Sequence, residues 1–195
     1  MADILDLGPQ TKEVLRLAEG VREEQFAQPT PCPDYTVRQL LGHLVELTGA
    51  FADAGRKNLG PGLDVSPDSR TPELREDWRT ALPRLFAELA EAWREPAAYQ
   101  GMTRAGGVDL PGEVAALVVA DELLVHGWDL ARATGQEYAP DPAALRAAHG
   151  FLAQAAEESE RPPIFGPVVE VPAGAPLLDR TIGLSGREPE WSPRS

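Results

Sequence analysis

The chain of 195 residues contains one cysteine, Cys32, and only three histidines. A single cysteine excludes an internal disulfide and any framework of zinc-binding cysteines. No apolar run approaches the roughly 20 residues that a membrane-spanning helix needs. The first residues also lack the basic and apolar regions of a signal peptide. We therefore expect a cytoplasmic protein with no membrane partner.

Positive charge is scarce as well. Lys and Arg number 18 against 31 Asp and Glu, so the formal net charge is −13 at pH 7. Nucleic-acid binding needs a basic face that neutralises phosphates, and docking on anionic lipid needs positive charge too. This composition argues against both kinds of partner. The chain is long enough to bury a core, so we expect a single domain over residues 1–195, with a helical bundle at about 8–158 and a tail at about 159–195.

Strand signals are weak along the whole chain, whereas apolar residues at helical spacing recur between proline- and glycine-rich segments. Four long helices joined by loops predict an all-α fold, most simply a four-helix bundle, with an additional helix before the tail. Loops are expected at 58–70 and 101–107. The tail is expected to pack across the bundle, because it contains the apolar residues Ile164, Phe165, Val168 and Val169. The expected helices span about 9–26, 36–55, 71–93, 111–134, 141–158 and, within the tail, a short one at about 176–184.

Several residues predict where these helices begin and end. Thr36 and Gln39 have the spacing of a capping box at the start of the second helix. Thr71, followed by a proline, is a candidate N-cap of the third helix. Pro83 lies inside that helix and predicts a kink or a break. Gly135 follows the fourth helix as a C-terminal stop.

Polar side chains occur where the helical pattern predicts burial. Glu122, His126 and Asp129 share one apolar side of the fourth helix, because residues at i, i+4 and i+7 lie on one face. His43 falls on the apolar stripe of the second helix. A buried carboxylate without a partner costs several kcal/mol, so these groups should be paired with one another or bound to a metal.

The spacing suits a metal site. Glu122 and His126, one turn apart, can bind one cation, and His43 from a facing helix can supply a third ligand. Three protein ligands with an open position are typical of catalytic zinc, and two histidines with one carboxylate are also typical of non-heme iron. Asp129 would then accept the free ring N–H of a ligating histidine. The alternative is a metal-free polar network of the same residues.

Two further residues carry weaker signals. His149 suits a surface or helix-packing role, with a fourth or replacement metal ligand as the alternative. Cys32 precedes the second helix, where the helix dipole can lower the pKa of a thiol. We favour a small buried apolar role for it instead. The sequence identifies no catalytic residue.

Two segments are familiar: TPCPDYTVRQLLGHL at 30–44 and ELLVHGWDLARATG at 122–135. The ending, with GREPEW at 186–191, adds to them. Together they resemble an actinobacterial family of metal-binding proteins related to the N-terminal domain of mycothiol-dependent maleylpyruvate isomerase, in the DinB-like superfamily.

This resemblance implies a DinB-like four-helix bundle holding a divalent metal, zinc or nickel. The family's His, Glu and His ligands would fall on His43, Glu122 and His126. The isomerase has a separate C-terminal domain that contributes to thiol binding, and residues 159–195 are too few for one. The resemblance therefore implies the metal site more directly than a dependence on mycothiol.

The function expected on this basis is that of a metal-dependent enzyme. It would use a low-molecular-weight, mycothiol-type thiol for transfer or isomerisation on a small electrophilic substrate. The alternative is a non-catalytic protein that binds a metal or a small molecule, or acts as a regulatory partner. The resemblance also implies a homodimer, although no stripe of residues identifies its interface.

Overall fold

The computed structural model describes residues 4–60, 63–64, 71–157 and 165–193. These residues form mainly α-helix, with one small antiparallel hairpin, so the all-α class is confirmed. The helices are α1 (Gly8–Glu19), α2 (Val37–Gly55), α3 (Trp78–Ala92), α4 (Gly112–Thr134), α5 (Pro142–Glu157) and α6 (Leu177–Leu184), with short 3-10 helices at Glu23–Gln25 and Pro96–Tyr99 and strands β1 (Met102–Ala105) and β2 (Val108–Pro111).

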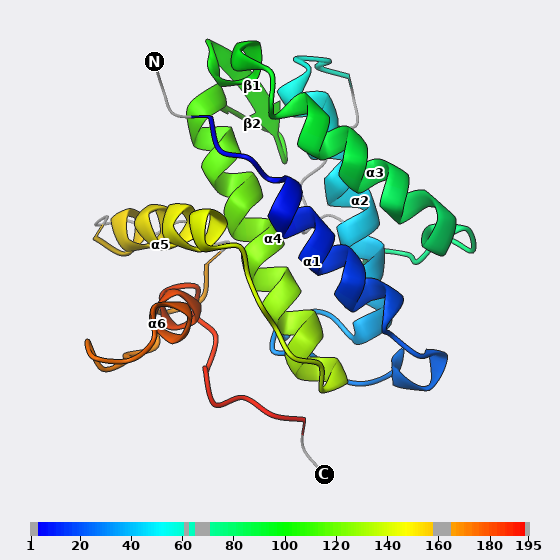
Figure 1. Ribbon diagram of the computed structural model, residues 1–195, viewed down its shortest axis with the longest axis vertical. Helices are drawn as coiled ribbons and strands as arrows, with labels where there is room; N and C mark the ends of the chain where they lie inside the picture. Colours follow the sequence, from blue (N-terminus) through cyan, green and yellow to red (C-terminus); the bar gives the residue numbers. More distant parts are fainter. Residues whose placement is uncertain (1–3, 61–62, 65–70, 158–164, 194–195) are drawn as a thin grey trace.

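The first four helices form the predicted four-helix bundle (Figure 1). Helices α1 and α2 each contact both α3 and α4, so the four helices enclose one core. The additional helix α5 packs on the outer side of α4, and α6 packs on α5. Among the described helices, none combines the length and apolar character needed to cross a lipid bilayer.

Helix α4 is the central element. Leu123, Leu124 and Val125 are consecutive and all buried, so apolar side chains face out on most sides of this helix. That burial follows from its position between the other bundle helices, α1 and α2, and the additional helix α5. Gly135 ends α4 with a positive φ of 70°, which confirms the predicted stop.

The capping box of α2 is also confirmed. The Thr36 hydroxyl oxygen accepts from the backbone N–H of Gln39 at 3.4 Å, and the Gln39 side-chain oxygen accepts from the Thr36 N–H at 2.8 Å. This arrangement fixes the first turn of α2 and with it the face on which His43 lies.

Two predicted helix boundaries are wrong. Helix α1 ends at Glu19 rather than near residue 26. Helix α3 begins at Trp78, so Thr71 is not its N-cap. Residues 71–75 instead cross α2 without helical structure, where the backbone of Glu73 lies so close to Gly42 that a Cβ there would be 2.9 Å away. Close packing across α2 therefore overrides the local capping signal.

Of the two alternatives predicted at Pro83, a kink or a break, the break does not occur: α3 continues from Trp78 to Ala92. Pro83 lies in the second turn. A proline removes the N–H that would bond to the carbonyl four residues earlier, so here the lost bond is the one to Arg79. One missing bond near the start of the helix leaves the later turns intact.

The predicted loop at 101–107 is largely a hairpin. Strands β1 and β2 pair antiparallel, and Gly106 and Gly107 connect them with φ of 57° and 81°. Two adjacent positive φ values are what a tight two-residue hairpin turn requires. The buried Thr103 hydroxyl donates to the Ala54 carbonyl at 2.6 Å, which ties the hairpin to the end of α2.

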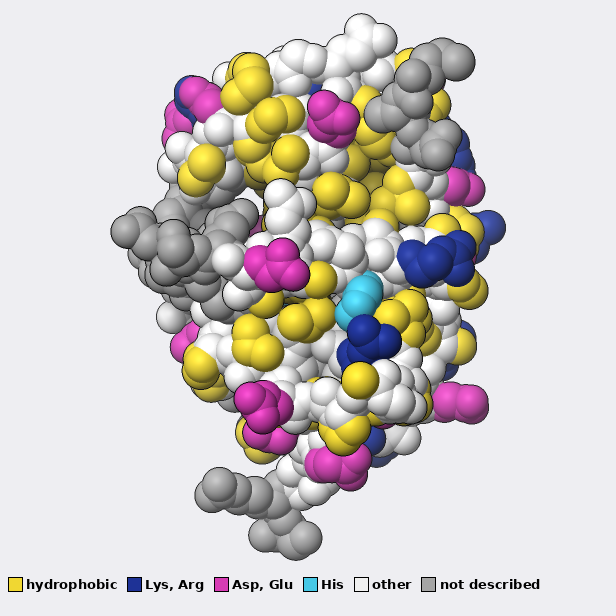
Figure 2. Space-filling view, turned by 90° about the vertical axis from the view of Figure 1, so that its left-hand side faces the viewer, with side chains coloured by type: hydrophobic (Ala, Val, Ile, Leu, Met, Phe, Trp, Pro, Cys, Tyr) yellow, Lys and Arg dark blue, Asp and Glu magenta, His cyan; other side chains and the backbone are white. Residues whose placement is uncertain are grey.

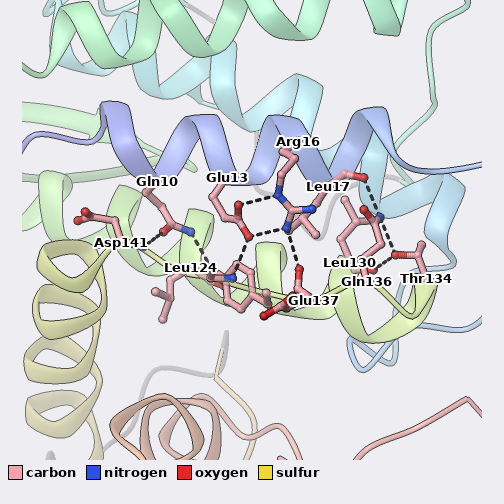
Figure 3. A network of polar contacts seen from close by, with 12 residues as sticks. Gln10, Glu13, Arg16, Leu17, Leu124, Leu130, Thr134, Gln136, Glu137 and Asp141 are labelled. Carbon is pink, nitrogen blue, oxygen red and sulfur yellow. Dashed lines mark hydrogen bonds and ion pairs between the residues drawn. The ribbon is translucent and has the colours of Figure 1, made fainter.

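A polar network joins α1 to the segment after α4 (Figure 3). The Gln10 side-chain amide donates to the Tyr138 hydroxyl, which donates to the Leu124 carbonyl, both at 2.8 Å. Arg16 donates to the Glu137 carbonyl at 2.7 Å. The chain leaving α4 is thus held against both α1 and α4.

The tail is partly covered. The predicted short helix is present as α6, and Phe165 packs against Phe151 of α5 with ring centroids 6.0 Å apart. Val168, which the apolar pattern predicts to be covered, is 42% exposed. The backbone N–H of its neighbour Val169 donates to the Gly183 carbonyl of α6. Successive side chains of an extended segment point to opposite sides, so the side chains of Val168 and Val169 face opposite ways. Ile164, predicted to pack with them, lies outside the described residues.

Acidic side chains are spread over the face shown in Figure 2 rather than gathered in one patch. This distribution accords with the strongly negative net charge.

Candidate metal centre

His43 from α2 and Glu122 and His126 from α4 come together where these two helices meet. One Glu122 carboxylate oxygen, Oε2, lies 3.5 Å from Nε2 of His43 and 3.2 Å from Nε2 of His126. The candidate ligand atoms of these three residues, here called the triad, all lie within 4.8 Å of one another. The structure thus brings together the three residues that the sequence selects.

The triad is largely shielded from water. The side chains of His43, His126 and Glu122 are 12%, 9% and 28% exposed. Burial on its own raises the pKa of Glu122, but hydrogen bonds from both imidazoles lower that pKa well below its usual range. Burial on its own lowers the pKa of His126, but hydrogen bonds to Asp129 and Glu122 raise it to about 9. Without a metal, an ionised Glu122 therefore faces a protonated His126 at neutral pH.

Asp129 lies behind His126, as the helical spacing predicts. Its carboxylate is fully buried, and Oδ2 accepts the Nδ1–H of His126 at 3.0 Å. With Nδ1 engaged in this bond, Nε2 is the ring nitrogen that faces Glu122 and the cavity. This is the orientation that a metal-ligating histidine backed by a carboxylate requires.

Arg187 is a further neighbour of the site that the sequence patterns did not predict. This residue follows α6 in the tail, its side chain is 13% exposed, and its Nη2 lies 3.3 Å from Oδ2 of Asp129. A buried Asp129 needs a positively charged partner, and this requirement alone could have predicted that an arginine or lysine lies beside it. Periodicity along α4 could not show which arginine of the tail supplies the charge.

A cavity of about 390 Å³ opens beside the triad. Tyr35 forms one wall, with its ring centroid 5.1 Å from that of His43. Apolar side chains and the Arg187 guanidinium form other parts of the wall. The lining residues are Cys32, Pro33, Asp34, Tyr35, His43, Asp121, Glu122, Val125, His126, Phe165, Gly166, Pro167, Ser185, Gly186 and Arg187. This volume suits a small molecule.

Cys32 and His149 lie outside the triad. Cys32 lines the cavity but is buried, and burial raises the pKa of its thiol to about 11, which favours the small apolar role over a reactive thiolate. Nδ1 of His149 lies 3.1 Å from the Thr181 hydroxyl of α6. The structure therefore gives His149 the predicted helix-packing contact and does not bring it to the triad.

The donor set fits a divalent transition-metal ion. Two imidazole nitrogens and one carboxylate oxygen are ligands that zinc, nickel and ferrous iron accept, whereas calcium and magnesium prefer oxygen alone. The Glu122 carboxylate also contributes the negative charge that a buried cation needs. His43, Glu122 and His126 would hold such an ion at the wall of the cavity.

The chain is similar to known proteins in sequence and, separately, in fold. Residues 7–131 match the family described as "Mycothiol maleylpyruvate isomerase N-terminal domain". The uncharacterized protein Rv0738 of Mycobacterium tuberculosis is 31% identical over 127 residues, which are 65% of this chain and 64% of that protein. The uncharacterized protein Rv0036c of the same organism is 26% identical over 97% of this chain and 76% of its own length.

Solved structures of mycothiol-dependent maleylpyruvate isomerase have the same fold. One superposes with a TM-score of 0.55 at 18% identity, over 75% of this chain and 68% of that one. A variant of that enzyme gives a TM-score of 0.54 at 17% identity, over 73% of this chain and 65% of the other. The family match covers more than half of this chain, and we conclude that the protein belongs to the mycothiol maleylpyruvate isomerase N-terminal domain family.

Proposed function

We propose that the protein is a divalent-metal-dependent enzyme that uses a low-molecular-weight thiol of the mycothiol type for transfer or isomerisation on a small electrophilic substrate. The observation that carries this proposal is the triad at the wall of a cavity, in a family named after a mycothiol-dependent isomerase. Zinc is the metal we propose first, with nickel as the alternative. A cytoplasmic location and a homodimer belong to the same proposal.

In this proposal the triad, Asp129 and the apolar cavity wall have different roles. A divalent metal bound at the triad would favour the deprotonated, nucleophilic form of a thiol. Glu122 balances positive charge, while Asp129 holds the His126 ring in place through Nδ1. Val125 and Phe165 contribute apolar wall to the cavity and so reduce the water around a bound substrate.

A second candidate is a protein that binds a metal or a small molecule without catalysis. A specific observation favours it: Glu122 and Asp129 are already engaged. Glu122 contacts both histidines, and Asp129 contacts His126 and Arg187. Each carboxylate is thus already part of an ion pair through one of its oxygens, which favours a holding role over proton transfer.

Metal analysis tests the proposal. Protein without an affinity tag, purified without chelator, is analysed by elemental mass spectrometry beside the double variant His43→Ala/His126→Ala. His149→Ala is the matched control, because His149 lies outside the triad. We expect about one equivalent of metal in the wild type and the control, and none in the double variant at unchanged helix content.

Turnover then separates the two candidates. Wild-type protein is assayed with a panel of low-molecular-weight thiols and small electrophiles. Thiol-dependent turnover that disappears in the double variant supports the enzyme. A metal-loaded protein without turnover favours the binding protein, and a wild type that takes up neither zinc nor nickel contradicts the proposed metal site.

A further inference from the structure

The tail is attached to α4 at two points near the triad. Arg187 contacts Asp129, and the Trp191 carbonyl accepts from Nε of Arg132 at 2.9 Å. Asp129 and Arg132 are three residues apart on α4 and therefore lie on one side of that helix. Figure 1 shows the segment after α6 running toward the end of α4 at which Asp129 and Arg132 lie. Only the first of these attachments reaches a residue that touches the triad.

A chain of polar contacts leads from the tail to the triad. Arg187 lies 3.3 Å from Oδ2 of Asp129, and the same oxygen lies 3.0 Å from Nδ1 of His126. Nε2 of His126 in turn lies 3.2 Å from Glu122. Asp129 has no exposed surface on its side chain, so His126 and Arg187 are the neighbours that compensate the burial of its carboxylate.

Arg187 is the charged side chain in direct contact with Asp129. A metal-ligating histidine gives its Nε2 lone pair to the ion and keeps its Nδ1–H for a second partner. The hydrogen bond from His126 Nδ1 to Asp129 is therefore retained when Nε2 holds a metal, and the position of Asp129 sets the orientation of the ring. Arg187 and the Nδ1–H together compensate the burial of the Asp129 carboxylate.

We propose that Arg187 is a positioning residue of the metal centre. By pairing with Asp129, it holds that carboxylate in place, and through it keeps the His126 ring turned with Nε2 toward the cavity. The tail is then part of the metal centre, although it supplies no ligand. This inference rests on the proposed function, because it takes the triad as the metal site.

The test compares zinc dissociation constants, measured on the whole chain by competition with a chromogenic chelator. Arg187→Ala should weaken zinc binding by about 10- to 100-fold, the usual effect of removing a group that supports a ligating histidine. Arg187→Lys should restore most of the affinity, since it keeps the positive charge. Arg132→Ala is the matched control, because it loosens the same tail at its other attachment without touching Asp129, and it should bind zinc like the wild type.

A double variant sharpens the test. If Arg187 acts through Asp129, adding Arg187→Ala to Asp129→Asn should cost no further affinity. Wild-type zinc affinity in Arg187→Ala would overturn the inference. So would an equal loss in Arg132→Ala, which would reduce Arg187 to an attachment of the tail.

Failure of the proposed function is seen separately, as a wild type that binds neither zinc nor nickel. The positioning role is then decided by NMR of the metal-free protein, with the His126 signals assigned through His126→Gln. We expect a protected Nδ1–H proton signal in the wild type that is lost to exchange with water in Arg187→Ala. An unchanged signal would overturn the inference in that case.

Discussion

The imidazole rings of His43 and His126 meet edge to face, with their centroids 4.8 Å apart and their planes at 82°. The rings reach this contact from different helices, α2 and α4. Glu122 lies within 3.5 Å of a nitrogen of each ring. The three side chains therefore form one unit, and removal of any one should affect what the other two can bind.

Glu122→Gln tests the charge of this unit. The amide has nearly the shape of the carboxylate but lacks its negative charge, so zinc affinity should fall by at least about 100-fold while helix content is retained. Titration with zinc in the presence of a competing chelator measures the change. Glu113→Gln, at an exposed position in the first turn of the same helix, is the control and should leave affinity unchanged.

Zinc binding should depend on pH because His126 must lose a proton to bind. Its pKa of about 9 in the metal-free protein means that the proton is present at neutral pH. Affinity should therefore rise by about tenfold per pH unit between about pH 6 and about pH 8 and level off above the pKa. Asp129→Asn, which removes one cause of the raised pKa, should give a shallower dependence over the same range. A flat profile in the wild type would contradict this account.

Cys32 should react slowly in the folded protein. Burial raises the pKa of its thiol to about 11 and also limits access, so alkylation by iodoacetamide near neutral pH should be on the order of 100-fold slower than in denaturing guanidinium. Mass spectrometry of timed samples gives both rates. Similar rates in the two conditions would show that the thiol is exposed and ionised, contrary to its position in the cavity wall.

Gly42 and Gly49 lie on the same helix and should respond oppositely to alanine. A Cβ at Gly42 would lie 2.9 Å from the Glu73 backbone, whereas nothing lies within 4 Å of a Cβ at Gly49. Gly42→Ala should lower the free energy of unfolding by about 1–3 kcal/mol. Gly49→Ala should raise it by up to about 1 kcal/mol, because alanine favours helix. Chemical denaturation of both variants checks the pair, and equal effects would contradict the close crossing of residues 71–75 over α2.

The part of the site that lies on helices was predictable from the sequence. Glu122, His126 and Asp129 share a face of α4 because of helical spacing alone, and the same spacing places His43 on the inner side of α2. The bundle itself was predictable too, since four amphipathic segments separated by loops have few other ways to bury their apolar faces.

The features that the sequence did not predict correctly involve contacts between segments far apart in the sequence. Thr71 has the local chemistry of an N-cap, but the packing of Glu73 against Gly42 decides its structure. The glycine pair of the hairpin is a recognisable turn signal, yet the flanking strands are only four residues each and show little alternation. Arg187 pairs with Asp129 across the fold of the tail, which no local pattern encodes.

The separation of His43 from Glu122 along the chain has a kinetic consequence. An ion bound by both residues would join α2 to α4, two elements that approach only when the bundle is assembled. The metal–ligand bonds must break before these helices can separate, so the ion would act as a reversible cross-link and slow global unfolding. Unfolding rates measured in denaturant with and without added zinc would then differ for the wild type and coincide for His43→Ala.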